Sequence, residues 1–162
     1  MLIYYILMIT SLSAITVNGL QGFIGFKIYN ANHIAFAFVS TILYMFTQTL
    51  IMFYFIGAGK KIKETIINYD LEKKIYQDVI KIKRILFPPL TLNMLFVGTA
   101  FVLGGGVHTG AISKYWHTAL FFISIFHYIK VIIIQHKSFI ENSNILSLVG
   151  KQLQVKLNKK KE

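Results

Sequence analysis

GKKIKETIINYDLEKKIYQDVIKIKR, residues 59–84, is the most polar stretch of the chain and lies between two strongly apolar halves. Its basic residues are Lys60, Lys61, Lys63, Lys73, Lys74, Lys81, Lys83 and Arg84. Positive charge in a short loop beside membrane spans is retained on the cytoplasmic side. This segment is therefore predicted to be cytoplasmic and to set the orientation of the apolar segments before and after it.

The composition is that of an integral membrane protein. Of the 162 residues, 55% are hydrophobic and only 14% are charged, against roughly 25% charged in an ordinary soluble domain. The net charge is +11. The lysine and arginine residues that carry it flank the apolar runs, so the expected partner is anionic lipid headgroups and not nucleic acid. The sequence contains no cysteine, which excludes disulfides and thiolate-bound clusters.

Four apolar runs are each about long enough to cross a bilayer, which takes roughly 20 residues. They cover residues 2–26, 34–56, 87–107 and 116–135. The sequence therefore predicts an all-α integral membrane protein, a single membrane domain over residues 1–162, with four transmembrane helices in two hairpins. Two further amphipathic helices are expected on the cytoplasmic side, at 60–84 and 137–157, with their apolar faces on lipid or on a partner. A helical hairpin is the alternative for the first of them.

The basic residues are distributed unevenly between the predicted turns. Lys27 and Lys114 are the only ones in the two outer turns. Both termini are therefore predicted to be cytoplasmic. A bacterial-type inner membrane is the default location, and an organelle membrane is the alternative.

Several local signals place the ends of the helices. Asn32 and Ser113 are suited to cap the second and fourth spans, and Thr109-Gly110 is expected to break the third. The sequence Gly57-Ala58-Gly59 is expected to kink or end the second span. Pro88-Pro89 is expected to open the third, because proline is tolerated in the first turn of a helix.

The carboxylates argue against two classes of function. All of them fall in segments predicted to be cytoplasmic, and they are Glu64, Asp70, Glu72, Asp78, Glu141 and Glu162. Proton-coupled transporters usually carry an intramembrane carboxylate, and di-iron sites need several. Neither class is therefore favoured.

Histidine is the only residue type that offers a candidate site. The predicted topology brings His33, His108 and His117 to the same outer rim, and places His127 deeper in the fourth span. A b-type haem needs two imidazoles from different helices at one depth, so a pair among the three outer histidines is a candidate for binding it. The same three could instead hold zinc or copper, and His127, near Tyr128, could donate to a quinone carbonyl. The alternative is that these histidines lie at the interface for amphipathic reasons alone.

The favoured function is that of a small integral membrane subunit of a larger respiratory or electron-transfer complex, bound to other membrane subunits and without catalytic activity of its own. It would hold haem b or line a quinone pocket near the outer face. The layout of the spans resembles that of four-helix cytochrome b membrane anchors, although no motif is shared. One alternative is a structural or assembly subunit without cofactor, and another is a small metal or solute carrier acting as an oligomer.

Overall fold

The computed structural model describes residues 1–28 and 30–159, and within them the chain forms four long helices. These are α1 (Leu2–Ile24), α2 (His33–Asn68), α3 (Lys74–His108) and α4 (Lys114–Lys159). Each is long and apolar enough to cross a membrane, as the composition predicts. Residues 29 and 160–162 lie outside the described part.

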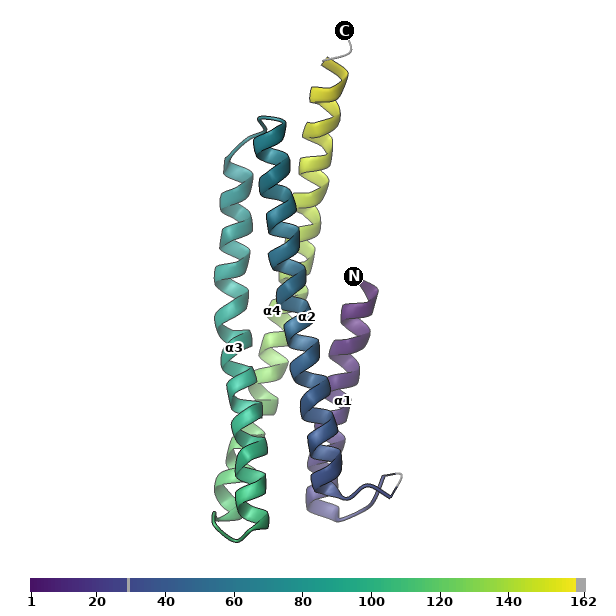
Figure 1. Ribbon diagram of the computed structural model, residues 1–162, viewed down its shortest axis with the longest axis vertical. Helices are drawn as coiled ribbons and strands as arrows, with labels where there is room; N and C mark the ends of the chain where they lie inside the picture. The colour runs from purple at the N-terminus through teal and green to yellow at the C-terminus, as the bar shows by residue number, and fades with distance from the viewer. Residues whose placement is uncertain (29, 160–162) are drawn as a thin grey trace. The chain divides into compact units, whose positions relative to one another are not determined.

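The chain divides into two compact units. Unit 1 comprises Met1–Ile51 and Pro89–Ile132, and unit 2 comprises Met52–Pro88 and Ile133–Glu162. Unit 1 contains α1 and parts of the other three helices, whereas unit 2 contains only parts of α2, α3 and α4. The turns that follow α1 and α3 lie at the same end of unit 1 (Figure 1).

Three of the helices are much longer than the predicted spans. The 36 residues of α2 correspond to about 54 Å, against a hydrocarbon core of about 30 Å. The helix continues through Gly57 and Gly59, which were expected to kink or end it. It also supplies the first part of the expected amphipathic segment 60–84. That segment is a helical hairpin, in which α2 ends at Asn68 and α3 begins at Lys74.

The start of the third span differs from the prediction. Pro88 and Pro89 lie inside α3, not in its first turn, because the helix begins at Lys74. A proline has no N–H to donate within the helix, so the carbonyls of Arg84 and Ile85 lose their helical donors. The favourable packing of the preceding residues outweighs this loss: Ile75, Val79, Ile82 and Leu86 are all buried.

The expected separate helix at 137–157 is part of α4, which is continuous from Lys114 to Lys159. No proline interrupts this stretch, and its apolar residues pack against the other helices of unit 2. Val149 and Ile145 pack in unit 2 against a cluster formed by Ile62, Ile66, Leu71, Ile75 and Val79. The apolar faces of the two predicted amphipathic segments therefore contact each other.

The turns behave as their residues predict. Gly25 ends α1 with a positive φ of 77° and donates its N–H to the carbonyl of Gln21. The Asn32 side chain accepts a hydrogen bond of 3.0 Å from the Ala35 N–H at the start of α2. Gly110, with φ 74°, follows the end of α3. Left-handed conformations of this kind cost glycine little. The predicted cap at Asn32 and the predicted break at Thr109-Gly110 are confirmed, whereas the cap at Ser113 stays a prediction.

The core of unit 1 contains a polar network to which all four helices contribute. The Tyr44 hydroxyl donates to the Asn93 Oδ1 at 2.5 Å, and the Asn93 Nδ2 donates to the Ser124 carbonyl at 2.9 Å. The Tyr128 hydroxyl lies 2.7 Å from the Ser11 hydroxyl and accepts from Gln48 at 3.1 Å. The Tyr44 and Tyr128 rings meet edge to face, with centroids 4.9 Å apart. This network joins the four helices at one level.

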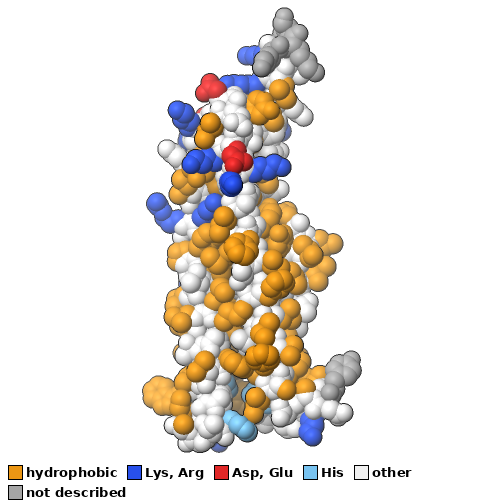
Figure 2. All heavy atoms as spheres, in the orientation of Figure 1, with side chains coloured by type: hydrophobic (Ala, Val, Ile, Leu, Met, Phe, Trp, Pro, Cys, Tyr) orange, Lys and Arg blue, Asp and Glu red, His pale blue; other side chains and the backbone are white. Residues whose placement is uncertain are grey.

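Side chains differ in kind between the surfaces of the two units. In Figure 2 hydrophobic side chains cover most of the visible face of unit 1, whereas lysine, arginine and acidic side chains gather over unit 2. Histidine side chains lie beside a hollow at the end of unit 1.

Candidate functional site

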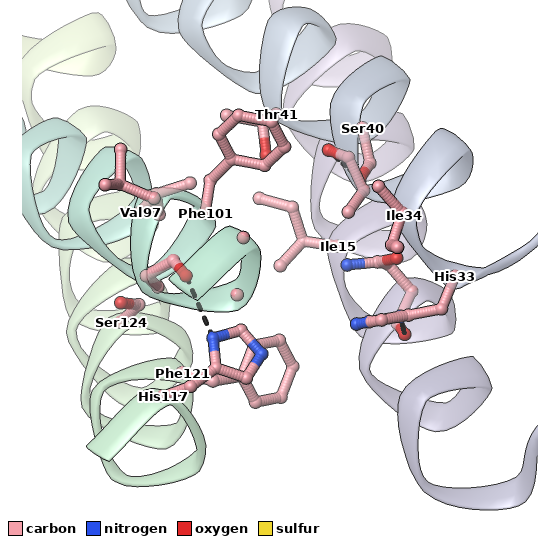
Figure 3. A pocket seen from close by; sticks show the side chains of 16 residues that line it. Ile15, His33, Ile34, Ser40, Thr41, Val97, Phe101, His117, Phe121 and Ser124 are labelled. Atoms are coloured by element: carbon pink, nitrogen blue, oxygen red, sulfur yellow. Dashed lines mark hydrogen bonds between the residues drawn. The ribbon is translucent and has the colours of Figure 1, made fainter. Parts of the chain in front are cut away.

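A cavity at the end of unit 1 brings two of the predicted histidines together. His33, in the first turn of α2, and His117, in the first turn of α4, both line it. Their ring centroids are 6.4 Å apart, with the ring planes inclined at 69°. The two side chains point toward one another in Figure 3. The predicted convergence of these two residues, 84 positions apart in the sequence, is what the structure shows.

Each ring is held by a backbone carbonyl of the preceding helix. The Nδ1 of His33 lies 3.1 Å from the Asn18 carbonyl oxygen of α1. The Nδ1 of His117 lies 2.9 Å from the Ala100 carbonyl oxygen of α3 (Figure 3). A carbonyl only accepts, so each Nδ1 carries the proton and donates it, and in the neutral ring Nε2 keeps its lone pair. Both rings are therefore oriented with an unprotonated Nε2, which is the atom that binds a metal.

A glycine lies beneath each ring. A Cβ on Gly22 would come within 2.9 Å of the Cε1 of His33, and a Cβ on Gly104 within 3.1 Å of the Cε1 of His117. The first distance is shorter than real Cβ contacts show, and the second is tighter than nine in ten of them, so an added methyl group would displace each ring, that of His117 by a few tenths of an ångström. In both cases the glycine follows the accepting carbonyl by four residues, one helical turn. The pair α1–α2 and the pair α3–α4 thus share one arrangement. In each, a histidine packs against a glycine and donates to the carbonyl that lies one helical turn before that glycine.

The cavity has apolar walls below the histidines and a wider polar mouth. The inner part, of about 170 Å³, is lined by Ile15, Val97, Phe101 and Phe121 among others. The outer part, of about 690 Å³, shares His33, His117, Gly104 and Phe121 with the inner part and adds Asn32, His108, Lys114, Tyr115 and Thr118. Both volumes lie beside the facing imidazoles, so a flat apolar ligand with a polar edge suits the space.

The other predicted site residues are placed differently. His108 is exposed and lines only the outer part of the cavity. Among residues 1–28 and 30–159, no three histidine, aspartate or glutamate side chains are grouped closely enough to hold a metal ion. The zinc or copper site of His33, His108 and His117 stays a prediction that this observation does not decide.

His127 lines neither part of the cavity. Its ring packs edge to face against Phe96, with centroids 5.4 Å apart. Its Nδ1 is buried and has no hydrogen-bond partner among the described residues. Tyr128, its neighbour in sequence, directs its hydroxyl into the polar core instead. A quinone contact at His127 therefore stays a prediction.

Four contributors to the site were not predicted in the roles that the structure gives them. The carbonyls of Asn18 and Ala100 carry no sequence signal, because every residue has a carbonyl. The role of Gly104, on which a Cβ would lie 3.1 Å from the Cε1 of His117, was also not predicted. Lys114 was interpreted only as a charge of the outer turn. Residues three apart on a helix are neighbours, so its spacing from His117 could have indicated that the two side chains lie close together.

Comparison of the chain with protein-family models, with curated proteins and with solved structures finds no match. The functional interpretation therefore depends on the geometry of unit 1.

Proposed function

We propose that this chain is a small integral membrane subunit of an electron-transfer complex, and that it holds one b-type haem between His33 and His117. The observation that carries the proposal is the spacing of the two imidazoles. Metal–imidazole bonds of about 2.0 Å place the centres of two rings on opposite sides of one iron roughly 6.3 Å apart. The centroids of His33 and His117 are 6.4 Å apart.

Further features support a haem over a small hydrated ion. The site offers two imidazoles and no carboxylate, since none of the aspartate or glutamate residues of the sequence falls in unit 1. Two histidine ligands on opposite faces suit a haem iron, whose other ligands come from the macrocycle. The apolar walls beside the histidines suit the macrocycle itself. When bound, a haem of this kind supplies one-electron transfer.

The proposal includes the orientation of the chain in the membrane and the kind of membrane. The lysine-rich segment 59–84 and both termini face the cytoplasm, and the turns that carry His33 and His117 face outward. A bacterial-type inner membrane with anionic headgroups is the proposed location. The exposed apolar surface of unit 1 faces lipid and the other subunits of the complex.

A visible spectrum of the purified protein, reconstituted with haem, tests the proposal. The reduced wild-type protein is expected to show the sharp bands of a bis-histidyl b-type haem. His33→Ala and His117→Ala are each expected to lose them. His127→Ala and His136→Ala, which leave the pair intact, are expected to keep them.

Two results would contradict the proposal. If the wild-type protein shows no bands with haem supplied, the structural-subunit alternative is favoured. If His108→Ala removes the bands and His33→Ala does not, the ligand pair is wrong.

A glycine variant tests the support of the ring without touching a ligand. Gly104→Ala adds a methyl group against the His117 ring and is expected to lower haem affinity by about tenfold, through displacement of the imidazole. Gly57→Ala is the control, because a Cβ there meets nothing within 4 Å and it lies in unit 2. Haem titration measures both, and equal affinities would remove the role assigned to Gly104.

A further inference from the structure

The mouth of the cavity carries positive charge that has no partner of opposite sign. Lys114 lines the outer part of the cavity. The ion pairs of residues 1–28 and 30–159 join Lys60 to Glu64 and Lys156 to Asp70, and neither involves Lys114. Unit 1 has no aspartate or glutamate in its sequence that could neutralise it. The ammonium of Lys114 lies instead over the Tyr115 ring, 5.9 Å from its centroid.

Other donors surround the same mouth. His108, in the last turn of α3, lines it together with Asn32 and Thr118. The first turns of α2 and α4 also reach it, because Asn32 precedes the first and Lys114 begins the second. The unpaired N–H groups at the start of a helix add positive potential. The mouth thus presents donors and positive charge, while the interior presents apolar walls and two imidazoles.

We infer that Lys114, assisted by His108, binds the carboxylate edge of the macrocycle and so fixes which edge of it faces the outer rim. This inference rests on the proposed haem site. A b-type haem is apolar over most of its area and carries two carboxylates on one edge. That pattern matches a cavity with apolar walls and a cationic mouth. Charge-assisted hydrogen bonds from an ammonium to a carboxylate are roughly twice as strong as neutral ones.

The inference separates Lys114 from the other lysine of the outer turns. Lys27 follows α1 and lines neither part of the cavity. Both lysines can meet lipid phosphates at the membrane surface. Only Lys114 is placed to meet an anionic group of a ligand that lies between His33 and His117.

The experiment compares iron protoporphyrin IX with its dimethyl ester, which keeps the macrocycle and the iron but has no ionised carboxylates. Binding is measured by spectral titration in an uncharged detergent. The wild-type protein is expected to bind the acid about tenfold more tightly than the ester. Lys114→Gln is expected to reduce that preference to about twofold or less. Lys114→Arg and Lys27→Gln are expected to keep it.

The outcomes distinguish this inference from the proposed function. If the wild-type protein gives no bis-histidyl spectrum with either porphyrin, the proposed haem site fails, and this inference fails with it. If both porphyrins give the spectrum with equal affinity, or Lys114→Gln behaves as Lys27→Gln does, the haem site stands and Lys114 serves lipid headgroups only. The ester titration uses the wild-type chain, so equal affinities for the two porphyrins would overturn the inference even if a lysine variant folds poorly.

Discussion

The two units both bury apolar and polar side chains, but a hydrogen-bonded network stands out in unit 1 and an aliphatic cluster in unit 2. Unit 1 joins its helices through hydroxyls and amides, with Tyr44, Asn93 and Tyr128 fully buried. Unit 2 packs isoleucine, leucine and valine around Ile62 and Ile66. Apolar burial gives no advantage between helices surrounded by lipid, so hydrogen bonds and close contacts hold them. In water, apolar burial is the main driving force. If unit 1 lies mainly in lipid and unit 2 mainly in water, as we propose, a difference of this kind is expected.

The largest effect is expected from the aliphatic core of unit 2. Ile66→Ala removes a side chain that is 5% exposed and should lower the stability of unit 2 by about 2–4 kcal/mol, from lost burial and the cavity left behind. Hydrogen exchange of residues 60–84 measures this. Ile67→Ala is the matched control on the same helix, because Ile67 is 66% exposed. If the control were equally destabilised, the face carrying Ile67 would be covered, and unit 2 would not be a water-exposed element.

The polar core of unit 1 should respond to the opposite kind of substitution. Asn93→Leu replaces the amide by an apolar side chain of similar size and removes the partners of the Tyr44 hydroxyl and of the Ser124 carbonyl. Leaving these groups unpaired is expected to cost about 1–3 kcal/mol, at the lower end if the unfolded helices find other partners in the membrane. Unfolding in detergent measures the change.

Leu95→Ala is its control, since Leu95 is on the same helix and 63% exposed. A Leu95 variant as unstable as the Asn93 variant would mean that apolar contacts hold unit 1, and the contrast between the units would fail.

The smallest effect is expected at the surface of unit 2. Lys60 and Glu64 form an ion pair of 3.9 Å, one helical turn apart, with both side chains well exposed. Glu64→Gln should change stability by less than about 0.5 kcal/mol, and less still at high salt. Hydrogen exchange at low and high ionic strength measures it. A loss above 1 kcal/mol would show that the pair is shielded from solvent.

The sequence predicted the helices because their signals are local. Apolar runs of sufficient length require helices in lipid, since every backbone group must be satisfied within the segment. The cap at Asn32 and the break at Thr109-Gly110 follow from single residues. The lengths of α2, α3 and α4 were not predicted, because Gly57, Gly59, Pro88 and Pro89 are local stop signals that packing overrides.

The candidate site was predicted in part for the same reason. The lysines of residues 59–84 predicted which ends of the four spans lie on the cytoplasmic side. That topology was sufficient to predict that His33 and His117 lie at the same, opposite end. Which carbonyls orient the rings, and which glycines lie beneath them, depends on the rotation of each helix about its axis. That rotation is set by contacts with neighbouring helices, such as the Tyr44 and Tyr128 pair, which no single stretch of sequence specifies.

The amino-acid sequence alone was sufficient to predict four helices long and apolar enough to cross a membrane, and it led to the prediction that three histidines share one rim. The tertiary structure decided that His33 and His117 form the facing pair, that His108 and Lys114 line its mouth, and that the polar segments extend α2, α3 and α4. The physical reason is that the length of an apolar run and the position of its flanking charges can be read from one stretch of sequence. The direction in which a side chain points depends on packing between segments that are far apart in the sequence.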